Sequence, residues 1–300
     1  ADNFREVIYD FRAVGIERDE AGREAHKAFL AALYPEIFYK LETLRENAGQ
    51  EQLIEVLYAV NRALREKHIL LYFVDQQLND FADSMGWTGR QFPAVDHDYL
   101  MVVDANMTNK SNRSIVREID LQVGIQPDGS LRNTLIVDYA YPASLAEHDP
   151  ALTILELVSN PPTRDYHNLY QMFVPAGSDL TRSRVQRVVT QVDDEAHTSF
   201  NSALLLPYDG SERLRFEYAT PVLVSAEEGI QHYRLLVQKQ AGTLGDSLTV
   251  RVTLPPGAAL VEATSGYEQT TSEDGIISLD YDLRLLTDLW IEVDYPLEDA

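Results

Sequence analysis

The stretch IDLQVGIQPDGSLRNTLIVDYAY, residues 119–141, decides the fold that we expect of this chain. Apolar and polar residues alternate on both sides of Pro127-Asp128-Gly129, which is the pattern of two strands that each bury one face. Asp and Gly are typical of tight turns, because Asp bonds the nearby backbone and Gly tolerates a positive φ. The stretch therefore predicts an antiparallel β-hairpin.

The two-residue period continues from residue 98 into the C-terminal region. Further strands are expected at residues 214–218, 233–239, 248–254, 276–281 and 289–295, with turns at residues 209–210, 255–257 and 274–275. Many short strands at this spacing are typical of β-sandwiches. We therefore expect two consecutive antiparallel, immunoglobulin-like sandwiches, a larger one at residues 97–227 and a smaller one at residues 228–300.

Residues 1–96 carry apolar residues at helical spacing instead. Residues three or four apart lie on one face of a helix. One such stripe contains Leu30, Leu33, Ile37, Leu41 and Leu44, and a second contains Leu53, Leu57, Val60 and Leu64. The run from Ile69 to Val74 is apolar on both faces, so we expect a short buried strand there. The chain is thus predicted to be α+β, with a mainly helical unit and one short strand in residues 1–96.

The composition of the chain excludes several functional classes. Its 300 residues carry a formal net charge of −23 and include no Cys. Such a charge repels phosphate backbones and anionic lipids, so we expect no nucleic acid partner. Without Cys there is no thiol nucleophile and no thiolate zinc site. No apolar stretch reaches the ~18 residues that a membrane span needs, so we expect no membrane insertion by this segment.

The acidic residues are unevenly distributed along the chain. Residues 265–300 contain ten acidic residues and a single basic one, Arg284. This stretch is expected to form a solvated β surface, or an acidic patch for cations or for a basic partner.

The segment from Asp104 to Asn112 is rich in side-chain oxygens. Asp104, Asn106 and Asn109 stand close to the spacing of the early ligands in a calcium loop. The loop lacks the central Gly, and Ile115 stands where the bidentate Glu would be. We therefore assign no metal ligand and keep these three residues only as candidates for a looser calcium site. The competing interpretation is a turn whose Asn and Asp side chains bond the backbone.

The same segment is locally basic in an acidic chain. Lys110, Asn112 and Arg113 are candidates for a loop that holds an anionic ligand, or for one that pairs with the protein's own carboxylates. No nucleophile elbow, phosphate loop or dinucleotide fingerprint is present. We therefore expect no catalytic residue and no cofactor, and the sequence favours a non-enzymatic role.

Several short segments follow one another in a recognisable order. They are EKHILLYF at residues 66–73, GWTG at 86–89, DYL at 98–100, DANMTNKSN at 104–112, DYHN at 165–168, VPAGS at 174–178 and QKQAGT at 238–243. In this order they resemble the C-terminal half of a bacterial family known only as domain of unknown function 4012. The resemblance spans roughly residues 66–243.

The resemblance implies an extracytoplasmic protein that is anchored to the membrane through a segment upstream of this chain. It implies no catalytic residue, because the family has no established reaction. We therefore expect a non-catalytic cell-envelope module with a binding or structural role, whose partner is an envelope polysaccharide or another envelope protein. Two alternatives stay open: the accessory half of a cell-wall polymer transferase, and a calcium-dependent adhesion module.

Overall fold

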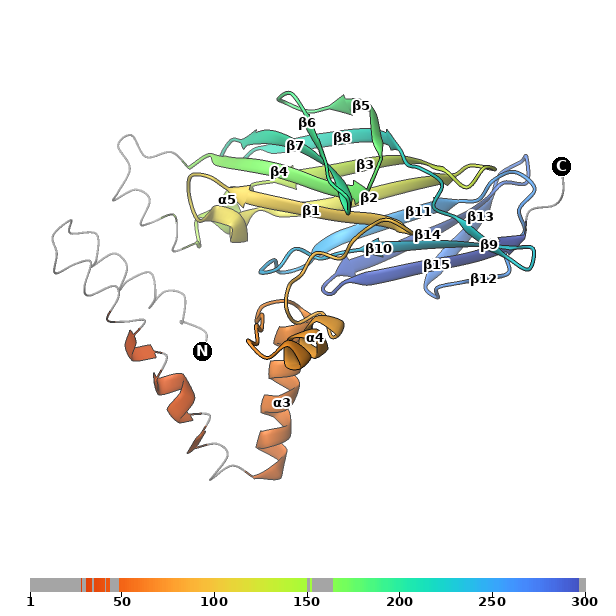
Figure 1. Ribbon diagram of the computed structural model, residues 1–300. Coiled ribbons are helices and arrows are strands. Elements are labelled where there is room, and N and C mark those ends of the chain that lie inside the picture. The colour runs from red at the N-terminus through yellow and green to blue at the C-terminus, as the bar shows by residue number, and fades with distance from the viewer. Residues whose placement is uncertain are drawn as a thin grey trace.

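The computed structural model describes residues 28, 31–33, 35–40, 42–43, 49–149, 152 and 164–296 (Figure 1). These residues form two β-sheets that pack together and a small helical unit that projects from them. The predicted α+β class is confirmed. The first predicted apolar stripe lies mainly outside the described residues; its two described members, Leu33 and Ile37, are helical.

In the part of the chain that the structure describes, fifteen strands build the two sheets. They are β1 (Asp98–Asn106), β2 (Val116–Ile125), β3 (Leu131–Ala140), β4 (Tyr166–Pro175), β5 (Asp179–Arg184), β6 (Thr190–Asp193), β7 (His197–Leu206), β8 (Ser211–Ala219), β9 (Ser225–Glu227), β10 (Ile230–Val237), β11 (Asp246–Thr253), β12 (Glu262–Ala263), β13 (Tyr267–Thr271), β14 (Ile277–Leu285) and β15 (Leu289–Pro296). One sheet has the order β12-β15-β10-β1-β4-β7-β6, with β9 beside β10. The other has the order β13-β14-β11-β2-β3-β8-β5.

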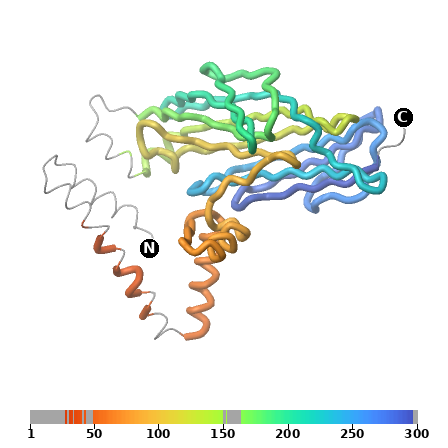
Figure 2. Tube along the Cα trace, in the orientation of Figure 1, coloured from red at the N-terminus to blue at the C-terminus, as the bar shows by residue number. Residues whose placement is uncertain are grey.

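Within the described ranges each sheet contains one parallel pair, so the sheets are mixed, whereas the pattern predicted antiparallel, immunoglobulin-like sheets. β10 pairs in parallel with β1 over residues 235–237, and β11 pairs in parallel with β2 over residues 247–253. Both pairs join the two predicted sandwiches to each other. The predicted boundary after residue 227 falls between β9 and β10, and both sheets continue across it (Figure 2). The two predicted sandwiches are thus two halves of one pair of sheets.

The predicted hairpin of residues 119–141 lies at the centre of the second sheet. It is formed by β2 and β3, in which Ile119 pairs with Val137 and Leu121 with Leu135. The turn between them closes with a bond from Gln126 N to Ser130 O (2.9 Å), and Gly129 adopts φ 79°. The inward residues of β2 and β3 belong to one continuous core that also includes residues of β10, β11, β14 and β15. Alternation along each strand therefore supplies a single core for both halves.

The helical unit contains α3 (Gln50–Arg65) and α4 (Gln76–Ser84). Asp75 caps α4 by accepting a bond from Leu78 N at 3.0 Å, as its position before an apolar stripe favours. None of the described helices is both long and apolar enough to cross a membrane. Two shorter helices, η1 (Ser111–Ser114) and α5 (Ala143–Ala146), lie between strands.

The short buried strand predicted at residues 69–74 is wrong. The segment is irregular, and Tyr72 and Val74 are 81% and 93% exposed. One backbone bond, from Leu71 N to Trp87 O at 2.8 Å, ties it to the chain after α4. An apolar run becomes a strand only beside a free sheet edge, and among the described residues no strand pairs with this run.

The segment QKQAGT, residues 238–243, fastens the helical unit to the sheets. Lys239 is buried, and its Nζ donates to the carbonyls of Glu66 (2.8 Å) and Thr243 (2.8 Å). Asp288 accepts from Lys239 N (2.8 Å) and from Lys67 Nζ (2.7 Å). A cationic side chain that ends among carbonyls holds the end of α3 against the connection from β10 to β11.

Candidate functional site

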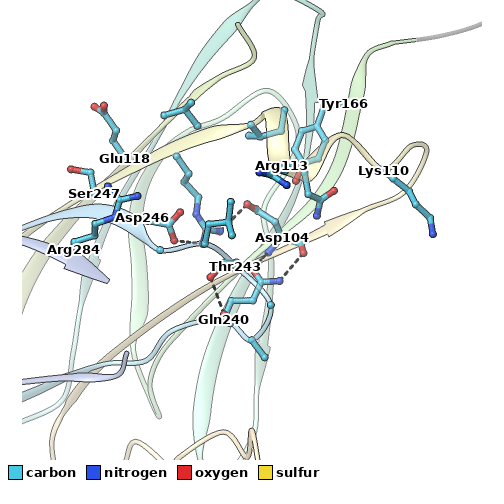
Figure 3. Close-up of a pocket in the computed structure, with 18 residues that line it drawn as sticks. Asp104, Lys110, Arg113, Glu118, Tyr166, Gln240, Thr243, Asp246, Ser247 and Arg284 are labelled. Carbon is cyan, nitrogen blue, oxygen red and sulfur yellow. Dashed lines mark hydrogen bonds and ion pairs between the residues drawn. The ribbon is translucent and has the colours of Figure 1, made fainter. Parts of the chain in front are cut away.

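A cleft of about 660 Å³ opens where the end of β1, the start of β2 and the β10–β11 connection meet (Figure 3). We call it the Arg117 cleft. It is lined by Asp104, Lys110, Asn112, Arg113, Tyr166 and Arg284, by residues 115–118 and by residues 240–247. The cleft therefore joins strands of both sheets to two loops that are far apart in the sequence.

Arg117 lies buried between two carboxylates in this cleft. Its Nη1 contacts Asp104 Oδ2 at 2.7 Å, and its Nη2 contacts Asp246 Oδ2 at 2.6 Å. Desolvation alone would lower the pKa of Arg117, but Asp104 and Asp246 raise it, and the net pKa lies well above its ordinary value. The guanidinium is therefore permanently charged and holds β1, β2 and β11 together.

Asp104 is fixed by further contacts that leave its carboxylate fully engaged. Its Oδ1 accepts from Tyr139 OH at 2.8 Å and from Asn168 Nδ2 at 2.6 Å. Burial, together with the neighbouring carboxylate of Asp104, raises the pKa of Tyr139 well above its ordinary value, so this phenol stays a donor. The side chain of Gln240 pairs with the backbone of Asp104 like a strand partner, at 2.9 and 3.0 Å.

A glycine places Asp246 at the edge of the cleft. Gly245 has φ 97°, a conformation that side chains with a Cβ rarely adopt. A Cβ at this position would also stand 2.7 Å from Leu286 Cδ2. The backbone can therefore turn into β11 here, and it delivers Asp246 to Arg117.

The exposed charges at the rim of the cleft are mainly positive. Lys110, Arg113 and Arg284 are exposed basic residues, and Glu118 is the exposed acidic residue among those that line the cleft. Arg117, Asp104 and Asp246 lie beneath them and are paired with one another. The lining of the cleft thus contains four basic and three acidic residues, in a chain whose net charge is −23.

One polar atom inside the cleft has no partner. Within the part of the chain that the structure describes, Nε of Arg117 is buried and makes no hydrogen bond, although the side chain is only 4% exposed. An unsatisfied buried donor costs about 1–3 kcal/mol. Core residues such as Tyr170 and Tyr218 carry unsatisfied hydroxyls as well, so this feature does not by itself mark a ligand site.

The structure brings four of the six predicted site residues into this cleft. Asp104, Lys110, Asn112 and Arg113 line it, whereas Asn106 and Asn109 do not. The last two residues brace the loop instead.

Side-chain oxygens of the loop are already used by its own donors. Asn106 Oδ1 accepts from the backbone N of Thr108 (3.1 Å), and Asn109 Oδ1 accepts from Ser111 N (3.1 Å). This is the turn geometry that the competing interpretation of the segment predicted. In the ranges that the structure describes, no group of three or more His, Asp or Glu side chains is arranged to hold a metal ion. The side-chain oxygens of Asp104, Asn106 and Asn109 accept hydrogen bonds from the protein's own donors.

The sequence did not single out four residues that shape the cleft: Arg117, Gln240, Asp246 and Arg284. Two signals pointed toward two of them. Gln240 lies in the segment QKQAGT, and Arg284 is the single basic residue of residues 265–300. Their meeting depends on the parallel pairing of β2 with β11, which the local pattern does not encode.

Comparisons with known proteins find structural similarity over part of the chain. No protein-family model and no curated protein matches the sequence. A putative nutrient binding protein from Legionella pneumophila is similar in structure, with 12% identity, a TM-score of 0.40, and 68% of this chain and 72% of that chain covered. An M1 zinc metallopeptidase from Deinococcus radiodurans is similar with 14% identity and a TM-score of 0.33, over 61% of this chain and 42% of that one. At these TM-scores the likenesses carry no argument about function.

Proposed function

We propose that this chain is a non-catalytic, extracytoplasmic binding module of a membrane-anchored protein of the bacterial cell envelope. Its ligand is a carboxylate-bearing polysaccharide, held in the Arg117 cleft. The observation that carries the proposal is the excess of basic residues in this cleft on a chain of net charge −23. The resemblance to the domain of unknown function 4012 family supports the location and the anchor upstream of this chain.

Electrostatics favours an anionic ligand at this cleft. Most of the surface repels a polyanion, so only a local cluster of cations can hold one. Arg113 and Arg284 have no ion pair among the described residues, and both reach the rim of the cleft. A guanidinium binds a carboxylate through two parallel hydrogen bonds, which gives a geometric preference as well as charge.

The lining favours a sugar chain over a peptide. Asn112, Thr243 and Ser247 present amide and hydroxyl groups to the same cleft. Such groups donate to and accept from sugar hydroxyls. The paired state of Asp104 and Asp246 also supports a binding role over a catalytic one, since neither carboxylate is free to move a proton.

The two alternative functions that the sequence leaves open would use this cleft in different ways. An accessory half of a cell-wall polymer transferase would use the same cleft to hold the polymer. A calcium-dependent adhesion module would need Asp104 to leave Arg117, Tyr139 and Asn168, and no contact in the described residues favours that exchange.

Binding of defined polymers to the purified chain tests the proposal. The probes are polygalacturonate as an acidic glycan, dextran as a neutral glycan and polyglutamate as an acidic peptide. At about 0.1 M ionic strength we expect binding of polygalacturonate that weakens as salt increases. Arg113→Glu and Arg284→Glu should each weaken it about tenfold, which corresponds to about 1.4 kcal/mol. Arg132→Glu, on an exposed position of β3 away from the cleft, should change it less than twofold.

Four outcomes contradict the proposal. Absence of polygalacturonate binding, or equal affinity for dextran, would rule out an anionic glycan as the ligand. Equal or tighter binding of polyglutamate would replace the polysaccharide with an acidic protein segment. Equal losses in the rim variants and in Arg132→Glu would show that binding follows net charge and not this cleft.

A further inference from the structure

The two outer edges of the seven-stranded sheet carry net charges of opposite sign. β5 forms one edge and presents Arg182 and Arg184, with Asp179 at its start and Arg187 following in the next loop. β13 forms the other edge and presents Glu268, and the acidic turn of residues 273–274 follows it. All of these side chains are exposed, and the two edges lie at opposite ends of the same sheet (Figure 1).

Each edge also contains two like charges placed directly opposite each other. Arg184 pairs in register with Arg215 of β8, and Glu268 pairs in register with Asp280 of β14. Like charges in directly opposed positions destabilise a sheet. Arg215 contacts Glu217 at 3.0 Å and Asp280 contacts Arg251 at 2.6 Å, whereas neither edge residue, Arg184 or Glu268, has an ion pair among the described residues. Each edge therefore lacks one counter-charge.

The unpaired side chains lie on the solvent face of the sheet at both edges. The residues next to Arg215 and Asp280 on their own strands, Phe216 and Leu279, are buried in the core. Because side chains alternate between faces, Arg215 and Asp280 face outward, and so do their register partners. At the basic edge, a depression of about 280 Å³ is lined by Arg182, Ser183, Arg184, Arg215 and Glu217.

We propose that the edge strand β5 of one copy of this chain binds the edge strand β13 of a second copy, with Arg182 and Arg184 against Glu268 and the acidic turn after β13. Charge complementarity between the two edges identifies a second copy of this chain as the binding partner. The two edges cannot meet within one copy, because five strands lie between them. The same charge sign on both edges would keep copies apart, which is a common use of edge charges. Opposite signs at opposite edges give a head-to-tail contact that can repeat along an open chain.

The association state of the whole chain tests this inference by sedimentation velocity. At about 0.1 M ionic strength the Debye length is about 10 Å, so distant charges of the neighbouring copy are screened and adjacent edge charges are not. We expect the average mass to rise with concentration under this condition. The rise should disappear at about 1 M ionic strength, where the Debye length is about 3 Å.

Charge reversal separates this contact from general adhesion. Arg184→Glu and Glu268→Arg should each abolish association, and mixing the two variants should restore it, since each supplies the charge that the other lacks. Arg132→Glu makes the same change of charge in the middle of the sheet and should leave association intact.

A wild-type chain that stays monomeric at every concentration contradicts the inference. So does association that persists in Arg184→Glu, or a mixture of the two variants that stays monomeric. Because Arg184 lies outside the Arg117 cleft, Arg184→Glu should bind polygalacturonate as the wild type does, which separates this inference from the proposed function.

Discussion

At the scale of the residue, Asp98 is a carboxylic acid that the fold encloses completely. It is the first residue of β1 and is 0% exposed. Its Oδ1 accepts from Tyr99 N at 2.9 Å, and its Oδ2 accepts from Tyr233 OH at 2.8 Å. Burial raises the pKa of Asp98 to about 6, although the bonds from Tyr233 and Tyr99 act in the opposite direction. The charge of this core position therefore changes near neutral pH.

Replacing Asp98 with Asn should alter the pH dependence of stability. The folded-state pKa is raised above the ordinary 3.8, so the folded chain holds this proton more tightly than the unfolded chain. Its contribution to stability is present below about pH 4 and is lost as the pH rises through about 6, by about 3 kcal/mol at most. Between about pH 4.5 and about pH 8, the wild type should lose stability relative to Asp98→Asn, as measured by urea unfolding. Parallel pH profiles for the two proteins would contradict this.

Arg117 is a second residue whose environment allows the effect of a substitution on stability to be predicted. Arg117→Met leaves the carboxylates of Asp104 and Asp246, each only 12% exposed, without their cation, which should cost about 3–5 kcal/mol in the free energy of unfolding. Arg213→Met is the matched control, since Arg213 contacts Asp138 at 2.6 Å but is 66% exposed. It should cost less than about 1 kcal/mol. Equal losses in the free energy of unfolding for the two variants would show that the Arg117 network stabilises the fold no more than an exposed ion pair does.

At the scale of the element, the local pattern predicts what depends on neighbours in sequence. The β2–β3 hairpin follows from alternation and from the turn at Gly129. The polar and basic residues of the loop at residues 104–113 are contiguous, so the sequence also predicts this loop. It does not predict the parallel pair of β2 and β11, since alternation looks the same in parallel and antiparallel strands. For the same reason Asp246 and Arg284 could not be placed beside Arg117.

Residues 69–74 show the opposite error, because here the local pattern predicts a strand that the fold does not form. Their apolar run satisfies the pattern of a buried strand, but the pattern does not record whether a sheet edge is free to receive it. In the fold, the strand that begins at Asp98 takes the place between β10 and β4. Tertiary competition therefore decides what the run becomes, and residues 69–74 stay irregular.

Val123 tests the assignment of the hairpin to the core. It is 2% exposed on the inner face of β2, whereas its neighbour Gln122 faces outward opposite Arg251. Val123→Asp buries an unpaired charge and should cost several kcal/mol, roughly the penalty of a buried ionisable group without a partner. Gln122→Asp is the control and should change stability by less than about 1 kcal/mol. Thermal unfolding of both variants measures the difference, and equal melting temperatures would contradict the assignment.

At the scale of the whole molecule, one core serves both halves of the sheets. Leu121 and Val123 of β2 pack in the same cluster as Val250 and Leu279. Two independent sandwiches would instead unfold as separate units, each with its own free energy.

Hydrogen exchange distinguishes these cases in the intact chain. The slowest amides of β3, in the first half, and of β14, in the second half, should report the same opening free energy, because they open together in global unfolding. A difference of several kcal/mol between the two strands would show that residues 97–227 and 228–300 unfold separately.

The proposed ligand of the Arg117 cleft is an acidic glycan. Hydrogen exchange of the whole chain, with and without saturating polygalacturonate, tests this proposal because it locates the ligand. We expect slower exchange at residues 110–118 and 240–247, which line the cleft. Residues 181–187 carry three exposed arginines outside the cleft and provide an internal control that should not change. No slowing at the cleft, or slowing confined to residues 181–187, would contradict the proposal.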